Sequence, residues 1–384
     1  MTDRIYLDWN ATAPLRPQAR TAVLAALDAA GNPSSVHAEG RAARRLIEHA
    51  REEVAALTGA EPRNLVFTSG GTEANMLALT PGSGADRLLV SAVEHPSVLA
   101  GGRFPPAAVE RLPVTDCGQI DLTALERRLA ASEQGQRVLV SLMLANNETG
   151  VVQPVSQAAR LAHAAGALLH VDAVQAAGRI SCDIKALGAD LLTLSGHKIG
   201  APKGVGALVR RDAALTIADP LVKGGGQERG LRAGTENVAG IAGFGAAASA
   251  AREGLAAENA RMLSLRDRLE TGLVAASPDV VIFGAGAERL PNTTLFARDG
   301  MKAETAIIAF DLDRVGVSSG AACSSGKVQP SHVLAAMGVP PQLARGAIRV
   351  SLGPTTTESE VDRFIDAWIR VSGALAKESQ GIAA

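Results

Sequence analysis

Short apolar segments separated by helical patterns constrain the fold of this chain more than any other feature of its sequence. Apolar residues dominate six runs, at positions 65–68, 87–91, 137–144, 167–171, 191–194 and 205–209. Nearly continuous apolar runs are typical of strands covered on both faces, because a strand with one solvent face alternates instead. Helical patterns, such as residues 39–58 and 154–165, lie between several of these runs. The alternation predicts a parallel, doubly wound α/β sheet, which binds its ligands beyond the carboxyl ends of its strands.

A change of pattern near residue 256 predicts a second, smaller α+β domain. Residues 258–275 have the pattern of a long amphipathic helix, and shorter segments with turn signals follow. A last helix is expected from Thr357, with Glu360 at capping-box spacing, to about Ala376. The length of 384 residues fits two domains. Since no Pro- or Ser-rich linker separates the two parts, we expect them to pack closely.

Composition and charge disfavour several classes of function. Lys and Arg number 38 and Asp and Glu 39, so the net charge of -1 gives no field that attracts nucleic acid or an acidic membrane. Residues 1–10 lack the apolar core of a signal peptide, and no apolar run is long enough to span a bilayer. Three cysteines, Cys117, Cys182 and Cys323, cannot form a disulfide framework and fit a reducing compartment. We expect a soluble cytoplasmic protein that binds neither nucleic acid nor membranes.

Two charged residues at predicted strand ends indicate the chemistry. Lys198 follows the apolar run 191–194 in a turn rich in glycine and polar residues, and Asp172 directly follows the run 167–171. A lysine in a partly dry cleft can lose its proton and form a Schiff base. An aspartate opposite it can keep a pyridine nitrogen protonated, which makes the ring an electron sink, as pyridoxal phosphate requires. A solvated lysine and a helix-capping aspartate are the alternative interpretations of each residue taken alone.

A glycine turn after a predicted strand provides a candidate phosphate site. In residues 67–74 the strand is followed by Gly70 and Gly71 and then by a helix, with Thr72 as a hydroxyl donor. Backbone N–H groups at such a helix start bind anions, and the helix dipole favours negative charge there. An ordinary glycine turn with a threonine cap is the alternative. A nucleotide-binding module is disfavoured, because residues 320–327 have five residues between glycines where a P-loop has four.

These motifs belong to a series that resembles one family across nearly the whole chain. In order, it comprises YLDWNAT at 6–12, GNPSS at 31–35 with His37, TSGGTEAN at 68–75, EH at 94–95, ANNETG at 145–150, VDAVQ at 171–175, SGHK at 195–198, GGGQERG at 224–230, GTEN at 234–237, SSGAAC at 318–323 and SHVL at 331–334. With these segments the chain resembles the cysteine desulfurases of the nitrogen-fixation and housekeeping type, pyridoxal-phosphate enzymes of fold type I. The resemblance implies a large domain at residues 15–255, with a mostly parallel sheet between helices. It also implies a small domain, formed by residues 1–14 and 256–384, that carries a catalytic cysteine loop at about 318–330.

Carried over to the matching positions, the resemblance implies the roles of the reacting residues. Lys198 bonds pyridoxal phosphate and later acts as a base, and Asp172 pairs with the pyridine nitrogen. His95 stacks on the ring and shuttles protons. Arg349 binds the carboxylate of L-cysteine, a task that suits a bidentate guanidinium.

The resemblance also implies the remaining contacts with the cofactor and the substrate. The phosphate is held by Gly71, Thr72, Ser195 and His197, and Thr235 reaches the phosphate of the other subunit of a homodimer. The ring hydroxyl is contacted by Gln175 and Asn147, and further substrate contacts are Asn147 and Asn10, with His37 a weaker candidate. Trp9 stands where the family more usually has Asn, which puts the specificity beside Asn10 in doubt.

The surroundings of Cys323 decide the reaction that we expect. Cys323 lies among Ser, Gly and Ala, close to Lys327, in a segment with little apolar anchoring, so we expect an exposed and mobile thiol. Cys117 and Cys182 are expected to be inert, as free cysteines usually are. A mobile thiolate can attack a sulfur atom held at the cofactor and carry it away.

The sequence therefore predicts a pyridoxal-phosphate-dependent L-cysteine desulfurase. It releases L-alanine, leaves a persulfide on Cys323 and passes the sulfur to an iron–sulfur scaffold or another acceptor protein. No intrinsic metal site is expected, although Cys323 can serve as a transient iron–sulfur ligand. The alternatives are a selenocysteine lyase or an aminotransferase of the same fold, and a non-catalytic binding protein. Cys323 argues against the aminotransferase, because transamination needs no thiol.

Overall fold

The computed structural model describes residues 4–133, 135–319 and 330–381. Its largest sheet has seven strands in the order β2-β8-β7-β6-β5-β3-β4. These strands are β2 (Leu65–Thr68), β3 (Arg87–Ser91), β4 (Val109–Leu112), β5 (Val138–Met143), β6 (Leu168–Asp172), β7 (Leu191–Ser195) and β8 (Gly206–Arg210). The pairs from β4 to β7 are parallel, which confirms the predicted mostly parallel α/β sheet.

Strand β8 is the exception, because it runs antiparallel to both β7 and β2. Only residues 196–205 connect β7 to β8, and a parallel crossover needs a dozen or more residues. The sequence pattern gave the position of this strand but not its direction. Strand β4, with the charged residues Glu110 and Arg111, was not predicted, because an edge strand of this composition lacks the apolar pattern.

Both faces of the large sheet are buried, and alternate residues of each strand point to opposite faces. Phe67, Leu89 and Val140 pack in one core cluster with α1 (Pro17–Leu27), α2 (Ala38–Leu57), α5 (Leu122–Ala130), α6 (Val155–Ala164) and α8 (Val238–Ala276). Their neighbours Val66, Leu88 and Leu139 face the other side, toward α3 (Gly71–Ala78) and α4 (Pro96–Leu99). Burial on both faces explains why these strands are apolar throughout.

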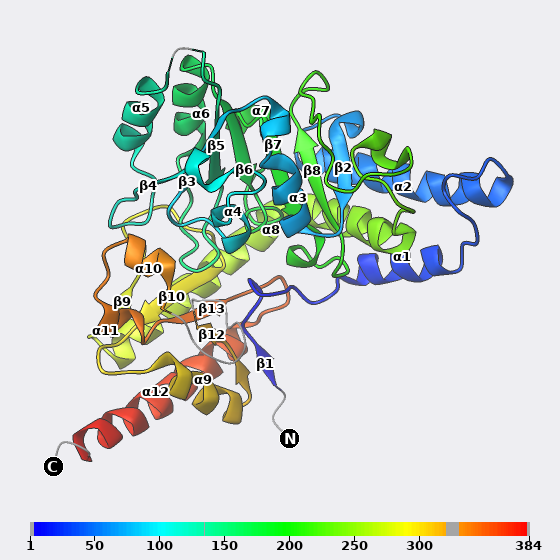
Figure 1. Ribbon diagram of the computed structural model, residues 1–384. Coiled ribbons are helices and arrows are strands. Elements are labelled where there is room, and N and C mark those ends of the chain that lie inside the picture. The colour runs from blue at the N-terminus through cyan, green and yellow to red at the C-terminus, as the bar shows by residue number, and fades with distance from the viewer. Residues whose placement is uncertain (1–3, 134, 320–329, 382–384) are drawn as a thin grey trace.

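A smaller antiparallel sheet lies beside the large one (Figure 1). Its order is β12-β13-β10-β9, from β9 (Val281–Ile282), β10 (Thr293–Ala297), β12 (Ser318–Ser319) and β13 (Ile348–Ser351). With α9 (Ala303–Leu312) and α12 (Glu358–Gly381) it encloses a second core that contains Phe296, Phe310, Phe364 and Trp368. The N-terminal β1 (Ile5–Tyr6) pairs in parallel with β11 (Val315–Gly316). Shorter helices are α7 (Ile184–Leu187), α10 (His332–Ala336) and α11 (Pro341–Ala344).

One long helix connects the two sheets. Helix α8 runs without a break across residue 256 and supplies Phe244 to the first core and Leu269 to the second. Figure 1 shows this helix passing from the large sheet down to α12, with both termini at the end of the molecule that holds the small sheet. The residue boundaries given above for two domains stay a prediction. No helix within the described residues is long and apolar enough to cross a membrane.

Candidate active site

A cavity of about 1230 Å³ opens where the carboxyl ends of β5, β6 and β7 meet the small sheet. It lies where ligands of doubly wound sheets bind. Its wall contains nearly all residues predicted to contact cofactor or substrate within one chain: Asn10, Gly71, Thr72, His95, Asn147, Asp172, Gln175, Ser195, His197, Lys198 and Arg349. The structure thus brings together residues that are more than 300 positions apart in the sequence.

Lys198 ends a short turn of helix that follows β7. Its Nζ donates hydrogen bonds to the carbonyl oxygens of Asn10, at 2.5 Å, and Ala11, at 3.0 Å. Burial, together with the nearby guanidinium groups of Arg349 and Arg179, lowers the pKa of Lys198 to about 7. A substantial fraction of the amine is therefore neutral near pH 7, and a neutral amine is the nucleophile that Schiff-base formation requires.

Asp172 is the last residue of β6, the strand next to β7, and it is 5% exposed. Its Oδ2 accepts a hydrogen bond from Nδ2 of Asn75 at 2.8 Å, and its Oδ1 accepts one from the backbone N–H of Val174 at 3.0 Å. These donors fix the direction of the carboxylate. Because a carboxylate has about four acceptor positions, it keeps capacity for a further N–H donor in the cavity.

The glycine turn before α3 lines the same cavity and closes tightly on the large sheet. A Cβ atom at Gly71 would lie 3.0 Å from Cγ2 of Val174 and 3.3 Å from Cβ of Ser195. Glycine therefore lets the start of α3 approach β7 closely. The first N–H groups of a helix have no partner within it, so this turn presents donors that suit an anion.

His197 lies beside this turn and is uncharged near neutral pH. Burial, with Lys198, Lys203 and Arg179 nearby, lowers the pKa of His197 to about 4. Its Nδ1 lies 3.1 Å from Oγ1 of Thr12, so the N-terminal segment holds the ring. A neutral imidazole contributes a hydrogen bond to an anion rather than a full charge.

His95 follows β3 and forms the N-cap of α4. Its Nδ1 lies 3.2 Å from the backbone nitrogen and 2.8 Å from Oγ of Ser97. Removal from bulk water lowers the pKa of His95, and Lys198 and His332 act in the same direction, while Asp172 opposes them. The imidazole on this wall of the cavity is therefore mainly neutral.

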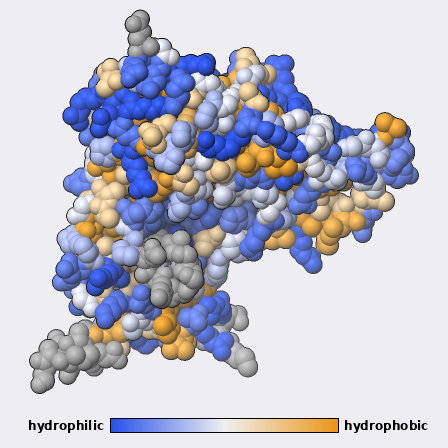
Figure 2. Space-filling view, in the orientation of Figure 1, coloured by the Kyte–Doolittle hydropathy of each residue, from blue (hydrophilic) through white to orange (hydrophobic). Residues whose placement is uncertain are grey.

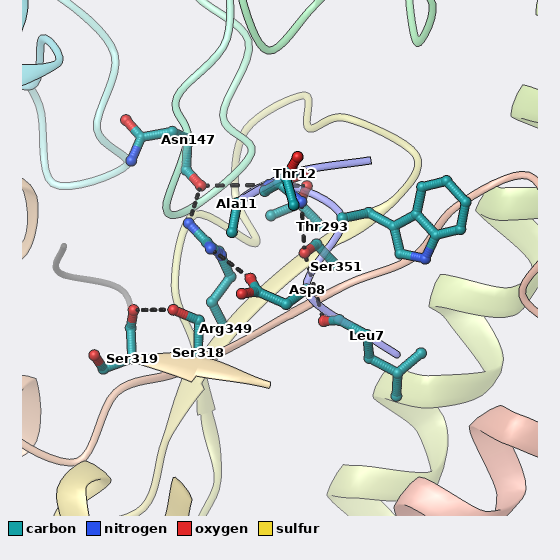
Figure 3. A network of polar contacts seen from close by, with 12 residues as sticks. Leu7, Asp8, Ala11, Thr12, Asn147, Thr293, Ser318, Ser319, Arg349 and Ser351 are labelled. Atoms are coloured by element: carbon teal, nitrogen blue, oxygen red, sulfur yellow. Dashed lines mark hydrogen bonds and ion pairs between the residues drawn. The ribbon is translucent and has the colours of Figure 1, made fainter. Parts of the chain in front are cut away.

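Arg349, from β13, is held where three distant segments meet (Figure 3). Its Nη2 donates to Oδ1 of Asp8 at 2.7 Å, and its Nη1 donates to the carbonyl oxygen of Asn147 at 3.0 Å. Its Nε is buried and has no partner among the described residues. The guanidinium thus has a fixed direction and unused N–H groups, which fits the predicted binding of a carboxylate.

The side chain of Asn10 connects the N-terminal segment to Asn147 and to the small sheet. Its Nδ2 donates to Oγ1 of Thr293 at 2.9 Å and to the carbonyl oxygen of Asn147 at 3.3 Å, and its Oδ1 accepts from Asn292 at 3.1 Å. Both hydrogens of its amide are thereby donated within the chain, and the substrate contact predicted for it stays a prediction. The carbonyl oxygen of Asn10 also accepts a hydrogen bond from Gln175 Nε2 at 3.0 Å.

Two buried glutamates, one in the cavity wall and one close to Asp172, were not singled out from the sequence. Glu148 lines the cavity, and burial raises its pKa to about 7, although Ser331 Oγ donates to its Oε2 at 2.5 Å. Burial, with Asp172 close by, raises the pKa of Glu94 well above its usual value. Both residues lie in the motifs quoted above, and their place in these motifs, directly after Val93 and after Asn147, is the signal that could have identified them.

Two predicted residues, His37 and Thr235, are not among the described residues that line the cavity. His37, the weaker candidate, is exposed and forms the N-cap of α2. Thr235 is exposed and belongs to the segment after the glycine-rich residues 224–230. Its predicted contact is with the other subunit, and a single chain does not test it. Cys323 lies outside the described residues, but Ser319 and Pro330, which flank residues 320–329, both line the cavity. No cluster of three or more His, Cys, Asp or Glu residues that could hold a metal ion occurs in the described part of the chain.

Comparison with known proteins relates nearly the whole chain to one group. A family model for class-V aminotransferases matches residues 5–364. The chain is 45% identical over 374 residues to a cysteine desulfurase of Cereibacter sphaeroides, with 95% of this chain and 94% of the relative covered. It is 40% identical over 386 residues to an IscS-like cysteine desulfurase of Mycobacterium tuberculosis, with 97% and 96% covered. The X-ray structure of a NifS-like protein from Rickettsia africae superposes with a TM-score of 0.89 at 37% identity, with 96% of this chain and 99% of that chain covered.

Proposed function

The chain belongs to the class-V aminotransferase family and, within it, to the NifS-like and IscS-like cysteine desulfurases, and we propose that its large cavity holds the pyridoxal phosphate and the L-cysteine of this reaction. The family is pyridoxal-phosphate dependent. One observation carries the assignment of the site: the Lys198 amine, whose pKa is lowered to about 7, shares a cavity with the buried carboxylate of Asp172.

The residues of the cavity fit this cofactor. Lys198 supplies an amine for the covalent bond, and Asp172 has acceptor capacity for a protonated ring nitrogen. The turn at Gly71 and Thr72, with Ser195 and His197, offers hydrogen-bond donors to a phosphate. His95 and Gln175 would border the ring. When bound, the cofactor supplies an electron sink for charge that develops on the substrate.

The chain's own residues divide the remaining tasks. Arg349 binds the α-carboxylate of L-cysteine with N–H groups that Asp8 and Asn147 leave free. Lys198, once released from the cofactor, takes the α-proton, because an amine with a pKa of about 7 is matched to this transfer near neutral pH. Asp172 balances positive charge at the ring nitrogen.

Cys323 is the proposed sulfur acceptor within the enzyme. Its thiolate attacks Sγ of the bound L-cysteine, an S–S bond forms, and the Cβ–Sγ bond breaks. The electron pair of the broken bond stays with the carbon fragment, which is protonated and leaves as L-alanine, while Cys323 keeps the sulfur as a persulfide. The support for this role is the position of Cys323 between Ser319 and Pro330, which both line the cavity.

Product analysis with L-cysteine tests this function. We expect stoichiometric L-alanine and persulfide from the wild type, loss of turnover in Cys323→Ala, and unchanged turnover in the matched variant Cys117→Ala. Undiminished alanine release by Cys323→Ala would refute the role of the thiol. A second variant, Lys198→Ala, should lose the visible absorbance of covalently held pyridoxal phosphate, and retention of that absorbance would refute the site.

We also propose that the enzyme acts as a homodimer. Figure 2 shows hydrophobic residues on the projecting part of the molecule formed by α1 and α2, where Leu24, Leu27 and Val36 are 49%, 66% and 87% exposed. Thr235 adjoins this region, because its neighbour Glu236 lies 3.3 Å from Nη1 of Arg44 in α2. A second copy that covers these side chains would lie close to Thr235, as the predicted contact with the partner's phosphate requires. Sedimentation of Leu27→Asp, compared with wild type, measures the predicted loss of the dimer.

The persulfide sulfur has a protein acceptor in this proposal. An iron–sulfur scaffold protein fits best, because it provides thiolates that can attack the outer sulfur of the Cys323 persulfide. Such thiol chemistry requires a reducing compartment, as the cytoplasm is. Transfer of labelled sulfur from the loaded enzyme to a reduced scaffold protein, but not to the same protein with alkylated cysteines, is the expected result.

A further inference from the structure

His95 is held by a chain of hydrogen bonds whose direction can be deduced. The backbone N–H of Ser97 points at Nδ1 of His95, with a separation of 3.2 Å, and a backbone N–H can only donate. Nδ1 is therefore the acceptor nitrogen of the imidazole. In a neutral imidazole one nitrogen accepts and the other carries the proton, so the proton of His95 resides on Nε2.

Asn75 fixes the direction of the next bond in the chain. It is 1% exposed, and its Nδ2 lies 2.8 Å from Oδ2 of Asp172 and 3.0 Å from Oγ of Ser97. Because an ionised carboxylate only accepts, the amide nitrogen must face Asp172, and both of its hydrogens are then donated. Ser97 Oγ receives one of them, so its own hydrogen is available to His95 Nδ1 at 2.8 Å.

The amide oxygen of Asn75 is left without a hydrogen bond in this arrangement, because Oδ1 is buried and has no partner among the described residues. A rotated amide would place this oxygen against the Asp172 carboxylate, where two acceptors repel each other. The Asp172 carboxylate therefore determines the amide orientation, and through the hydroxyl of Ser97 it adds a second donor to the nitrogen of His95 that the backbone N–H of Ser97 already makes the acceptor.

The protonated edge of His95 is the one left for a ligand. His95 lines the cavity, and its Nε2 has no hydrogen-bond partner among the described residues. The pKa of His95 is lowered, which keeps the ring neutral, and a neutral imidazole that already carries its proton on Nε2 has no lone pair there to accept another.

We propose that Asn75 and Ser97 are positioning residues that hold His95 as the Nε2–H tautomer, so that it meets the substrate–cofactor pair as a neutral hydrogen-bond donor rather than as a base. This rests on the function proposed above and narrows the role of His95 within it: the acceptor is a lone pair of oxygen or sulfur in the cavity, and proton removal falls to Lys198. The tautomer is a property of the protein that can be measured without turnover.

Nitrogen-15 NMR of the holoenzyme with ring-labelled histidine tests the proposal, with His95→Gln to assign the signals. At slightly alkaline pH we expect an unprotonated Nδ1 and a protonated Nε2 in the wild type. Ser97→Ala removes one neutral hydrogen bond to Nδ1 and should shift the tautomer ratio about fivefold, while Ser97→Thr, which keeps the hydroxyl, should restore it. Asn75→Leu should shift the ratio in the same direction, and the signals of His170, which is held by Ser141 and Thr193, serve as the internal control.

A protonated Nδ1 in the wild type, or an unchanged tautomer ratio in Ser97→Ala, would overturn the inference. If Asn75→Leu does not fold, Ser97→Ala and Ser97→Thr still decide the question. Failure is distinguishable from failure of the proposed function, since L-alanine formation in the same preparation reports the desulfurase reaction independently of the tautomer.

Discussion

A buried ion pair between α2 and the glycine-rich segment 224–230 is expected to contribute strongly to the free energy of unfolding. Arg51 and Glu228 are both 2% exposed at the side chain and form two hydrogen bonds, of 2.8 and 2.7 Å. Glu228 Oε2 also accepts the backbone N–H of Phe67 at 2.8 Å, and the Arg51 guanidinium lies 4.9 Å from the centre of the Phe67 ring. The pair therefore joins α2, the segment 224–230 and the strand that leads into the glycine turn of the active site.

Glu228→Gln keeps the shape of the side chain but removes the buried countercharge of Arg51, which leaves only the partly exposed carboxylate of Glu48, 3.1 Å from Nε, as its acidic partner. The NH₂ group of the new amide must also face either Arg51 or the backbone N–H of Phe67, and both of these are hydrogen-bond donors. Removal of one partner of a buried pair costs about 3–5 kcal/mol. Because Glu48 remains as a partner of Arg51, we expect a loss at the lower end of this range, about 3 kcal/mol, in the free energy of unfolding.

Urea denaturation followed by circular dichroism measures the effect. The matched control is Glu358→Gln, since Glu358 is 74% exposed and lies 3.9 Å from the half-exposed Arg268, and pairs of this kind contribute little. A Glu228→Gln variant whose unfolding free energy lies within about 1 kcal/mol of wild type would refute the reasoning, because it would show that the guanidinium is not desolvated as the structure has it.

Three further predictions concern the cavity. Gly71→Ala places a methyl group 3.0 Å from Val174, at an overpacking cost of about 1–3 kcal/mol. Pyridoxal phosphate should therefore bind about 10- to 100-fold more weakly in equilibrium dialysis. Unchanged affinity would mean that the turn does not hold the phosphate. The negative charge of Asp8 raises the pKa of Lys198, so Asp8→Asn should lower that pKa further. The pH dependence of cofactor uptake by the apoenzyme should then move to lower pH. A move to higher pH would contradict this. The pKa of Glu148 is raised from 4.5 to about 7 by folding, so the folded state binds more protons than the unfolded state in this window and stability falls as pH rises through it. Glu148→Gln should lack that fall in denaturation curves at several pH values, and an equal slope in both proteins would exclude it.

Much of the large sheet could be predicted because its strands are buried on both faces. The apolar runs at 65–68 and 87–91 coincide with β2 and β3. The predicted direction of the strands also led us to expect Asp172 and Lys198 close together. They follow adjacent parallel strands, which end at one edge of the sheet.

Other parts of the fold depend on contacts that leave no local pattern. Helix α8 is continuous although residues 238–251 are uncharged and the part from about residue 258 is amphipathic. The first part is buried against α1 and α2, and the second packs on α12. The reversed direction of β8 depends on the length of a connection, and Gly206 allows the strand to lie against the backbone of Gly70, where a Cβ atom would be 2.5 Å from a carbonyl carbon. Neither fact follows from the apolar character of the residues.

The active site shows the same division between what is local and what is not. The type of each functional residue and its place at a strand end follow from the sequence, but the state in which it works follows from its neighbours. The carbonyl oxygens of Asn10 and Ala11 hold the amine of Lys198, and Asp8 of the same segment holds Arg349. The N-terminal segment therefore fixes both the group that bonds the cofactor and the group proposed to bind the substrate carboxylate. Because Asn10 is itself held by Thr293 of β10, the geometry at Lys198 depends on how the small sheet packs. A substrate that binds Arg349 therefore contacts a side chain held by the same N-terminal segment that positions Lys198.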